Sequence, residues 1–122
     1  MKLIDTSSWI HALRPDGDES IRERVRGLLN TGNACWCPMV RLELWNGARG
    51  RHEKIVLDEM ALNLPGLPVT EEVWISAYAL AQKTREKGHT IPATDILIAS
   101  CARCHNVDIE HSDSHFDILA DL

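Results

Sequence analysis

Short apolar segments alternate with longer amphipathic segments along almost the whole chain, and this alternation limits the possible folds most strongly. The apolar segments are predicted strands, at 2–5, 34–37, 66–69 and 107–110. Helices are predicted between them, at 7–13, 19–29, 39–48, 52–63, 71–87 and 92–104, with a last helical turn or two at 114–119. Strands separated by helices form a mostly parallel sheet covered on both faces. The sequence therefore predicts an α/β fold.

The length and composition of the chain indicate one globular domain over residues 1–122. The 122 residues are 44% hydrophobic and 25% charged, which is ordinary for a single hydrophobic core. The formal net charge of −5 at pH 7 gives no basic footprint for nucleic acid. No stretch approaches the roughly 18 apolar residues of a membrane span, and the N-terminus lacks the pattern of a signal peptide. We therefore expect a cytoplasmic protein whose four cysteines are reduced thiols.

Four carboxylates stand next to predicted strands or apolar helices. Asp5 ends the first strand, Glu43 lies on an early helix, Asp95 precedes the apolar run 96–99, and Asp113 follows the last strand. In open α/β sheets, sites form beyond the carboxyl ends of the strands. Taken singly, each acid has a structural explanation, such as a favourable position at a helix N-terminus. If the four converge, however, they repel one another unless cations neutralise them, and hard oxygen ligands suit Mg²⁺ or Mn²⁺.

Four motifs follow one another along the chain in the order and spacing of a known family. They are Asp-Thr-Ser-Ser at 5–8, Glu-Leu-x-x-Gly at 43–47, Asp-Ile-Leu-Ile-Ala at 95–99 and Asp-x-x-Phe at 113–116. With these motifs the chain resembles a PIN domain and, more narrowly, the VapC toxins of type II toxin–antitoxin systems. The resemblance implies a PIN-like α/β/α sandwich with a central parallel sheet of four to five strands. It also implies a Mg²⁺- or Mn²⁺-dependent endoribonuclease, in which metal-activated water hydrolyses RNA phosphodiester bonds.

The resemblance also implies roles for individual residues. Asp5, Glu43, Asp95 and Asp113 would form the catalytic acidic quartet, and all of these except Glu43 would bind the metal ion. Thr6 would be the supporting hydroxyl behind Asp5. The implied partners are an RNA substrate, a cognate antitoxin protein and a second copy of the chain in a homodimer.

Two features depart from the family pattern. Members often carry Thr two residues before the last acid, where this chain has His111. Asp117, one helical turn after Asp113, therefore stays a competing candidate for the fourth acid. Members also often have one more strand after this segment, whereas the sequence given ends at Leu122. The fifth, edge strand is therefore expected to be very short or absent.

Phosphodiester hydrolysis by metal-bound water requires no nucleophilic side chain, and none stands out in this sequence. RNA would be drawn to an acidic protein by local arginines, because the guanidinium group binds phosphate at two points. Four arginines lie near the first two acidic motifs: Arg14, Arg41, Arg49 and Arg51. The alternative is that they belong to a solvated helix surface. A second function also stays open, that of a catalytically inactive PIN-like module that binds RNA or protein.

The segment from Cys101 to His105 matches C-x-x-C-H, the attachment pattern of c-type haem. Together with Cys35 and Cys37, its two cysteines would also offer four thiols to zinc. Both readings compete with a simpler one, in which all four cysteines are small buried hydrophobic residues, and we expect the latter.

The tryptophans and histidines receive no assigned role in catalysis. The four tryptophans are expected to be buried, with base stacking by Trp9 as the alternative. The six histidines share no compact metal-binding spacing. His111 and His115 flank Asp113 and could approach the site, but they are not counted among the ligands.

Overall fold

The computed structural model describes residues 1–122 as three short parallel strands and seven helices. In chain order these are β1 (Lys2–Ile4), α1 (Thr6–Leu13), α2 (Glu19–Asn30), β2 (Ala34–Cys35), α3 (Pro38–Gly47), α4 (Arg51–Asn63), α5 (Glu71–Glu86), α6 (Ala93–Cys104), β3 (Asp108–Glu110) and α7 (Ser114–Ala120). The predicted α/β class is confirmed. Local signals set several boundaries: the Thr70 side chain caps α5 by accepting a hydrogen bond from the Val73 N–H, as the sequence predicts.

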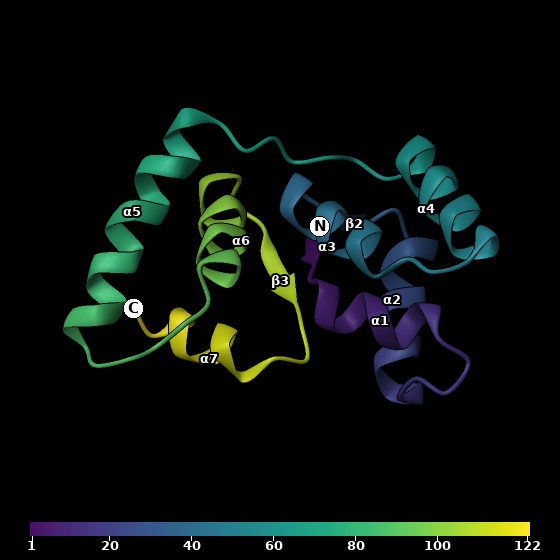
Figure 1. The fold of residues 1–122 in the computed structure, drawn as a ribbon, viewed down its shortest axis with the longest axis horizontal. Helices are drawn as coiled ribbons and strands as arrows, with labels where there is room; N and C mark the ends of the chain where they lie inside the picture. Colours follow the sequence, from purple (N-terminus) through teal and green to yellow (C-terminus); the bar gives the residue numbers. More distant parts are fainter.

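The sheet has the order β2-β1-β3, with both pairs parallel. Strand β1 is central, and its Leu3 and Ile4 are completely buried. The strands lie between two groups of helices, with α1 and α2 on one side and α5, α6 and α7 on the other (Figure 1). Because all three strands run in the same direction, the segments that follow them emerge at one edge of the sheet.

The expected four to five strands are wrong, because the sheet has three. The segment predicted as a strand at 66–69 forms only one parallel bridge, between Trp36 and Gly66. Pro65 and Pro68 flank this bridge, and proline has no N–H to donate to a longer ladder. Helix α7 is the last element of residues 1–122.

Helix α6 is the most deeply buried helix of the fold. Its residues from Asp95 to Ala102 are all buried, and it packs against α5, α7, α3 and β3. Figure 1 shows it between α5 and β3. An all-round apolar helix belongs inside a protein, so the run Ile96–Ala99 fixes this position. The first turn of α6 therefore brings a carboxylate, Asp95, into the interior. None of the helices is long and apolar enough to span a membrane.

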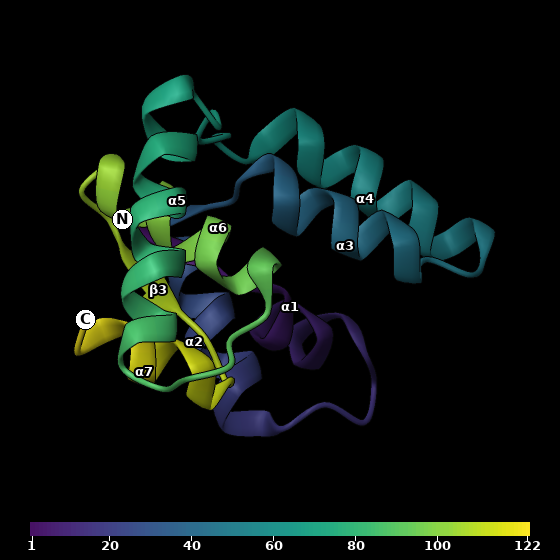
Figure 2. The same ribbon diagram turned by 60° about the vertical axis from the view of Figure 1, so that its left-hand side comes forward.

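Helices α3 and α4 pack against each other and extend away from the strands as a pair (Figure 2). Helix α3 also contacts α1 and α6, so its Glu43 faces the segment that follows β1. The arrangement leaves a groove between α1, α3 and α4.

Candidate active site

Asp5 lies directly after β1 and is only 3% exposed. It is the N-cap of α1: its Oδ2 accepts hydrogen bonds from the Ser7 N–H at 2.9 Å and the Ser7 hydroxyl at 2.6 Å. Its other oxygen, Oδ1, is buried and has no hydrogen-bond partner in the protein. A buried acceptor without a partner is costly, and a cation ligated by Oδ1 would remove that cost.

Ser7 joins the two loops that carry the aspartates after β1 and β3. Its hydroxyl donates to Asp5 and accepts a hydrogen bond from the Ser112 N–H at 3.0 Å. The Ser112 hydroxyl in turn donates to the Ser7 carbonyl oxygen at 3.0 Å. These bonds hold the segment before Asp113 against the start of α1. The hydroxyls at positions 7 and 112 therefore position carboxylates from distant parts of the chain.

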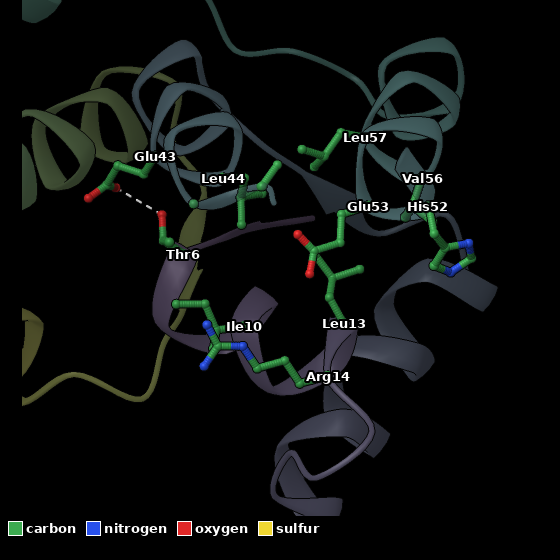
Figure 3. Close-up of a pocket in the computed structure, with 12 residues that line it drawn as sticks. Thr6, Ile10, Leu13, Arg14, Glu43, Leu44, His52, Glu53, Val56 and Leu57 are labelled. Carbon is green, nitrogen blue, oxygen red and sulfur yellow. Dashed lines mark hydrogen bonds between the residues drawn. The ribbon is translucent and has the colours of Figure 1, made fainter. Parts of the chain in front are cut away.

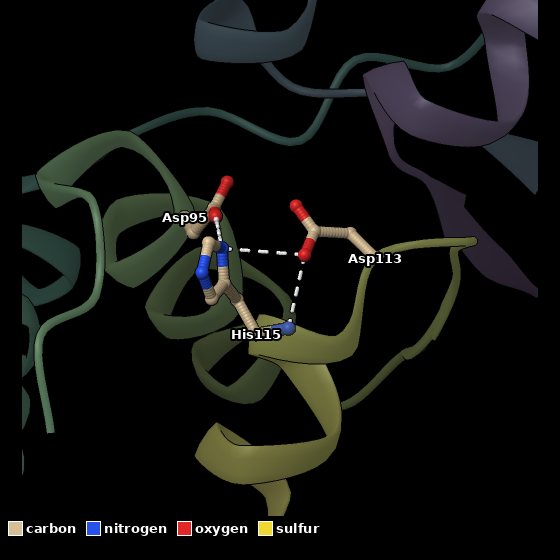
Figure 4. A group of neighbouring side chains, drawn as sticks. All are labelled: Asp95, Asp113 and His115. Carbon is tan, nitrogen blue, oxygen red and sulfur yellow. Dashed lines mark hydrogen bonds and ion pairs between the residues drawn. The ribbon is translucent and has the colours of Figure 1, made fainter.

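Asp95, Asp113 and His115 form a compact group at the N-terminal ends of α6 and α7 (Figure 4). The Nδ1 atom of His115 lies 3.0 Å from Asp95 Oδ2 and 3.2 Å from Asp113 Oδ1. Asp113 is the N-cap of α7, and its Oδ1 also accepts the His115 N–H at 2.9 Å. One oxygen or nitrogen from each residue lies within 4.8 Å of the others, a spacing suited to one metal ion.

Glu43 approaches the group from α3. Its Oε1 accepts a hydrogen bond of 2.8 Å from the Thr6 hydroxyl, which is drawn in Figure 3. Burial raises the pKa of Glu43, the Thr6 hydrogen bond opposes this, and the charges of Asp5 and Asp95 raise it further. The Glu43 carboxylate therefore lies within electrostatic reach of the aspartates from β1 and α6.

The pKa of Asp95 is raised for similar reasons. Burial raises its pKa, the hydrogen bond with His115 counteracts this rise, and the charges of Asp113 and Asp5 add to it. The four acids of the predicted quartet are thus brought together, although they come from four separate parts of the chain. Metal ions are the common means of balancing such a cluster, and its oxygen atoms match the ligands that Mg²⁺ and Mn²⁺ prefer.

The two candidates for the fourth acid have different surroundings. Asp113 contacts His115 beside Asp95, whereas the side chain of Asp117 is 76% exposed and pairs with His111 at 3.5 Å. The geometry favours Asp113. The hydroxyl expected behind Asp5 was assigned wrongly, because Thr6 bonds Glu43 and Ser7 fills that place.

His115 belongs to this group, although the sequence did not mark it as a ligand. Its place two residues after Asp113 suggested that it could approach the site, but the six histidines share no metal-binding spacing. The available signal was the pair Asp113-x-His115 at a helix N-terminus, where the N-cap carboxylate and the ring two residues later lie close together.

Other candidates lie outside this site. Trp9 is buried, which contradicts base stacking by this residue, whereas Trp74 is 40% exposed, so the expectation of four buried tryptophans is wrong for Trp74. Cys35, Cys37 and Cys101 are buried as expected, but Cys104 is exposed, so the expectation that all four are buried is wrong for that residue. The four arginines proposed for RNA contact are all exposed: Arg14, Arg41, Arg49 and Arg51.

Comparison with known proteins identifies similar sequences and folds. The family model of the PIN domain matches residues 2–122. Ribonuclease VapC11 from Mycobacterium tuberculosis is 33% identical over 124 residues, which cover 98% of this chain and 92% of that protein. Among solved structures, VapBC2 from Rickettsia felis bound to a promoter DNA fragment matches with a TM-score of 0.79 at 17% identity, covering 99% of this chain and 94% of that one. FitAcB from Neisseria gonorrhoeae matches with a TM-score of 0.76 at 24% identity, covering 100% and 94% of the two chains.

Proposed function

This chain belongs to the PIN-domain family, and from that premise we propose that it is a metal-dependent endoribonuclease, the toxin of a toxin–antitoxin pair. The observation that carries the proposal is the convergence of four carboxylates beyond the carboxyl ends of β1 and β3. Relatives that match nearly the whole chain are named VapC ribonucleases, which supports the same reaction. Residues 1–122 would act as one domain, built on a single cluster of 22 buried hydrophobic residues.

Three aspartates would hold the ion: Asp5 through its unpartnered Oδ1, together with Asp95 and Asp113. A bound Mg²⁺ or Mn²⁺ supplies a water of lowered pKa and neutralises charge on the phosphate. Glu43 would take the proton of the attacking water, because burial and the neighbouring carboxylates raise its affinity for protons. Thr6 would orient Glu43 for this transfer. As the water oxygen bonds to phosphorus, the bond from phosphorus to the leaving oxygen breaks, and that oxygen takes a proton from solvent.

RNA would approach along the exposed face near α1 and α3. Arg14 lines the groove next to Glu43, and Arg41 lies 5.6 Å from the ring centre of Trp36, as measured from its guanidinium carbon. These side chains give local positive charge on a chain whose net charge is −5. These phosphate contacts would position the RNA without selecting its sequence.

The antitoxin would bind in the groove between α1, α3 and α4 (Figure 3). The groove encloses about 650 Å³, counting the part open to solvent. Its walls include Ile10, Leu13 and Val56, while Glu43 and Glu53 add negative charge. A segment with an apolar face and one basic residue would match both features and would cover Glu43. Structural neighbours described as VapBC and FitAcB support such a partner. Unchanged antitoxin affinity after Leu13→Asp would contradict this location.

A second copy of the chain would cover the exposed apolar side chains of α5. Trp74, Ile75 and Tyr78 are each at least 40% exposed, and the ring centres of Trp74 and Tyr78 lie 6.4 Å apart. A patch of this kind marks an interaction surface, and its position away from Glu43 leaves the groove free. A monomeric mass in analytical ultracentrifugation at micromolar concentration would contradict the homodimer.

The test of the proposed reaction is cleavage of total RNA by the purified protein. We expect cleavage with Mg²⁺ or Mn²⁺, loss of cleavage with EDTA, and recovery when the ion is added in excess. Cleavage that persists in EDTA would contradict the metal mechanism. RNA binding without cleavage under any of these conditions would favour the alternative, an inactive PIN-like binding module.

A further inference from the structure

We propose that His115 is a direct ligand of the metal ion, through Nδ1, and that it makes the site select Mn²⁺ over Mg²⁺. This inference rests on the proposed function and deepens it, because it concerns which ion the same site holds. The family resemblance implies carboxylate ligands only, whereas this chain adds an imidazole nitrogen.

The position of the imidazole ring carries the inference. Nδ1 of His115 faces both candidate ligands, at 3.0 Å from Asp95 Oδ2 and 3.2 Å from Asp113 Oδ1 (Figure 4). An ion that these two carboxylates shared would lie within bonding reach of the same nitrogen, since the three donor atoms lie within 4.8 Å of one another. With the ring proton on Nε2, the Nδ1 lone pair points at this position.

The backbone holds the ring in this place. The N–H of His115 donates to Asp113 Oδ1, so the histidine and the N-cap aspartate are locked in one turn at the start of α7. The following residue, Phe116, is buried and anchors that turn in the core. Asp95 is fixed on the opposite side by the buried helix α6. A ring on a mobile loop would not be presented in this way.

A second and independent observation indicates that a cation belongs here. The Oδ1 atom of Asp5 is buried and makes no hydrogen bond, on a residue that is 3% exposed. The charge of Asp5 acts on both Asp95 and Glu43, so Asp5 lies within electrostatic reach of the group that Asp95 and Asp113 form with His115. A third carboxylate therefore lies near the two carboxylates and the imidazole of that group.

The donor set decides which ion is favoured. Mg²⁺ binds oxygen donors in a near-ideal octahedron and gives up its waters reluctantly. Imidazole suits the transition metals, and Mn²⁺ accepts carboxylates as well. A site of two or three carboxylates and one imidazole therefore favours Mn²⁺ over Mg²⁺. A site of carboxylates alone would discriminate less between these two ions.

The test is pulsed electron paramagnetic resonance of Mn²⁺ bound to the full chain after removal of metal with a chelator. Electron spin echo envelope modulation detects a ¹⁴N nucleus bonded to Mn²⁺, and this readout does not depend on activity. We expect a directly coordinated ¹⁴N in the parent protein. The absence of this coupling in protein that binds Mn²⁺ would overturn the assignment.

Two substitutions of His115 distinguish the effect of the ligating nitrogen from the effects of side-chain charge and shape. His115→Asn places an amide oxygen where Nδ1 was, because both atoms branch from Cγ. It should abolish the ¹⁴N coupling and raise the Kd for Mn²⁺ by about 10- to 100-fold, with a much smaller change for Mg²⁺. His115→Asp places a carboxylate oxygen there, and should keep Mn²⁺ binding without the coupling while improving Mg²⁺ binding over the parent.

His111→Gln is the matched control, because His111 also flanks Asp113 but its Nε2 pairs with Asp117 at 3.5 Å. This variant should keep the ¹⁴N coupling. Loss of the coupling would mean that the coordinated nitrogen belongs to His111 and would contradict the assignment to His115. An equal loss of Mn²⁺ and Mg²⁺ affinity in His115→Asn would also contradict selection by the imidazole. Circular dichroism melting of each variant checks that it folds.

Different results would contradict the proposed function and the assignment of His115 as a ligand. Cleavage that requires metal, together with bound Mn²⁺ that shows no ¹⁴N coupling, would leave the proposed function standing and remove the ligand assignment. A protein that binds no Mn²⁺ and cuts RNA in EDTA would remove both.

Discussion

At the scale of single residues, the site concentrates negative charge that the metal-free protein must tolerate. Burial raises the pKa values of Glu43 and Asp95, and each of these carboxyl groups also feels the charge of Asp5. A carboxylate whose pKa is raised on folding favours the folded state only while it is protonated. Its contribution is fully present below the unfolded pKa and is lost as the pH rises through the folded pKa. Glu43 and Asp95 therefore lower the stability of the metal-free protein when they are ionised.

The first prediction concerns Asp95→Asn, which removes one of these charges with little change of shape. At pH 7 the metal-free variant should unfold with a free energy equal to or higher than that of the parent. The difference should grow as the pH rises above about 4, the usual pKa of aspartate, because only the parent then ionises a carboxyl group at this position. Urea unfolding of the variant and the parent across a pH series, in the presence of EDTA, measures this difference in unfolding free energy. A variant that is less stable than the parent at pH 7 would contradict the electrostatic cost.

Sequence reasoning reached the identities of the acids but not the contacts that orient them. Asp5 and Asp113 could be anticipated because Asp5 ends one predicted strand and Asp113 lies shortly after another. The hydrogen bond between Ser7 and Ser112 could not, since it joins residues 105 positions apart. His115 was expected near the site but not as a ligand, because the nearness of its ring to Asp95 depends on how α6 and α7 pack.

At the scale of elements, a buried glutamate paired with a half-exposed arginine ties the third strand to the first two helices. Glu110 of β3 accepts hydrogen bonds from Arg24 of α2 at 2.8 Å and from Ser8 of α1, also at 2.8 Å. Burial alone would raise the pKa of Glu110, but the bonds from Arg24 and Ser8 and the charge of Arg24 hold it below its usual value of 4.5. The carbonyl of Glu110 also accepts the N–H of Asp5. This network therefore fixes the strand ends from which the site emerges.

The second prediction concerns Glu110→Gln, which leaves Arg24 without a charged partner. At pH 7 we expect a loss of about 1–3 kcal/mol in the free energy of unfolding, the usual cost of breaking a buried polar contact. The stability that Glu110 contributes is present above its unfolded pKa and is lost as the pH falls through its lower folded pKa. The variant and the parent should therefore converge in stability toward acid pH.

Glu19→Gln is the matched control, since Glu19 is exposed and pairs with Arg22 at 3.7 Å. Exposed pairs contribute little, so this variant should unfold like the parent. Equal effects of the two substitutions in thermal or urea unfolding would contradict a special role for the buried network.

The order of elements was largely readable from the sequence, and the extent of the sheet was not. Helix α5 begins at the cap that Thr70 signals, and the apolar run in α6 forced that helix into the interior. Gly66 looked like part of a strand because the residues around it are apolar. The prolines on either side limit pairing to one bridge, an effect that hydrophobic pattern does not report.

At the scale of the whole molecule, the fold assembles a charged site from separated residues. Asp5 and Asp113 follow parallel strands, Asp95 starts the central buried helix, and Glu43 lies on the helix pair that extends from the sheet (Figures 1 and 2). The groove beside Glu43 and the apolar face of α5 occupy different parts of the surface. Substrate and antitoxin would therefore meet the molecule at the groove beside Glu43, and the second subunit at a different place on α5.

The central claim is that the converging aspartates hold a metal ion that makes this chain a ribonuclease, and Asp5→Asn tests it most directly. The measurement is the single-turnover rate of RNA cleavage in Mn²⁺, with Asp117→Asn as the control, since Asp117 is an exposed aspartate outside the site. Asp5→Asn keeps the shape of the side chain but weakens a hard-metal ligand, so the rate should fall by about 100-fold or more, while Asp117→Asn should cut at the parent rate. Cleavage by Asp5→Asn at the parent rate would contradict the account.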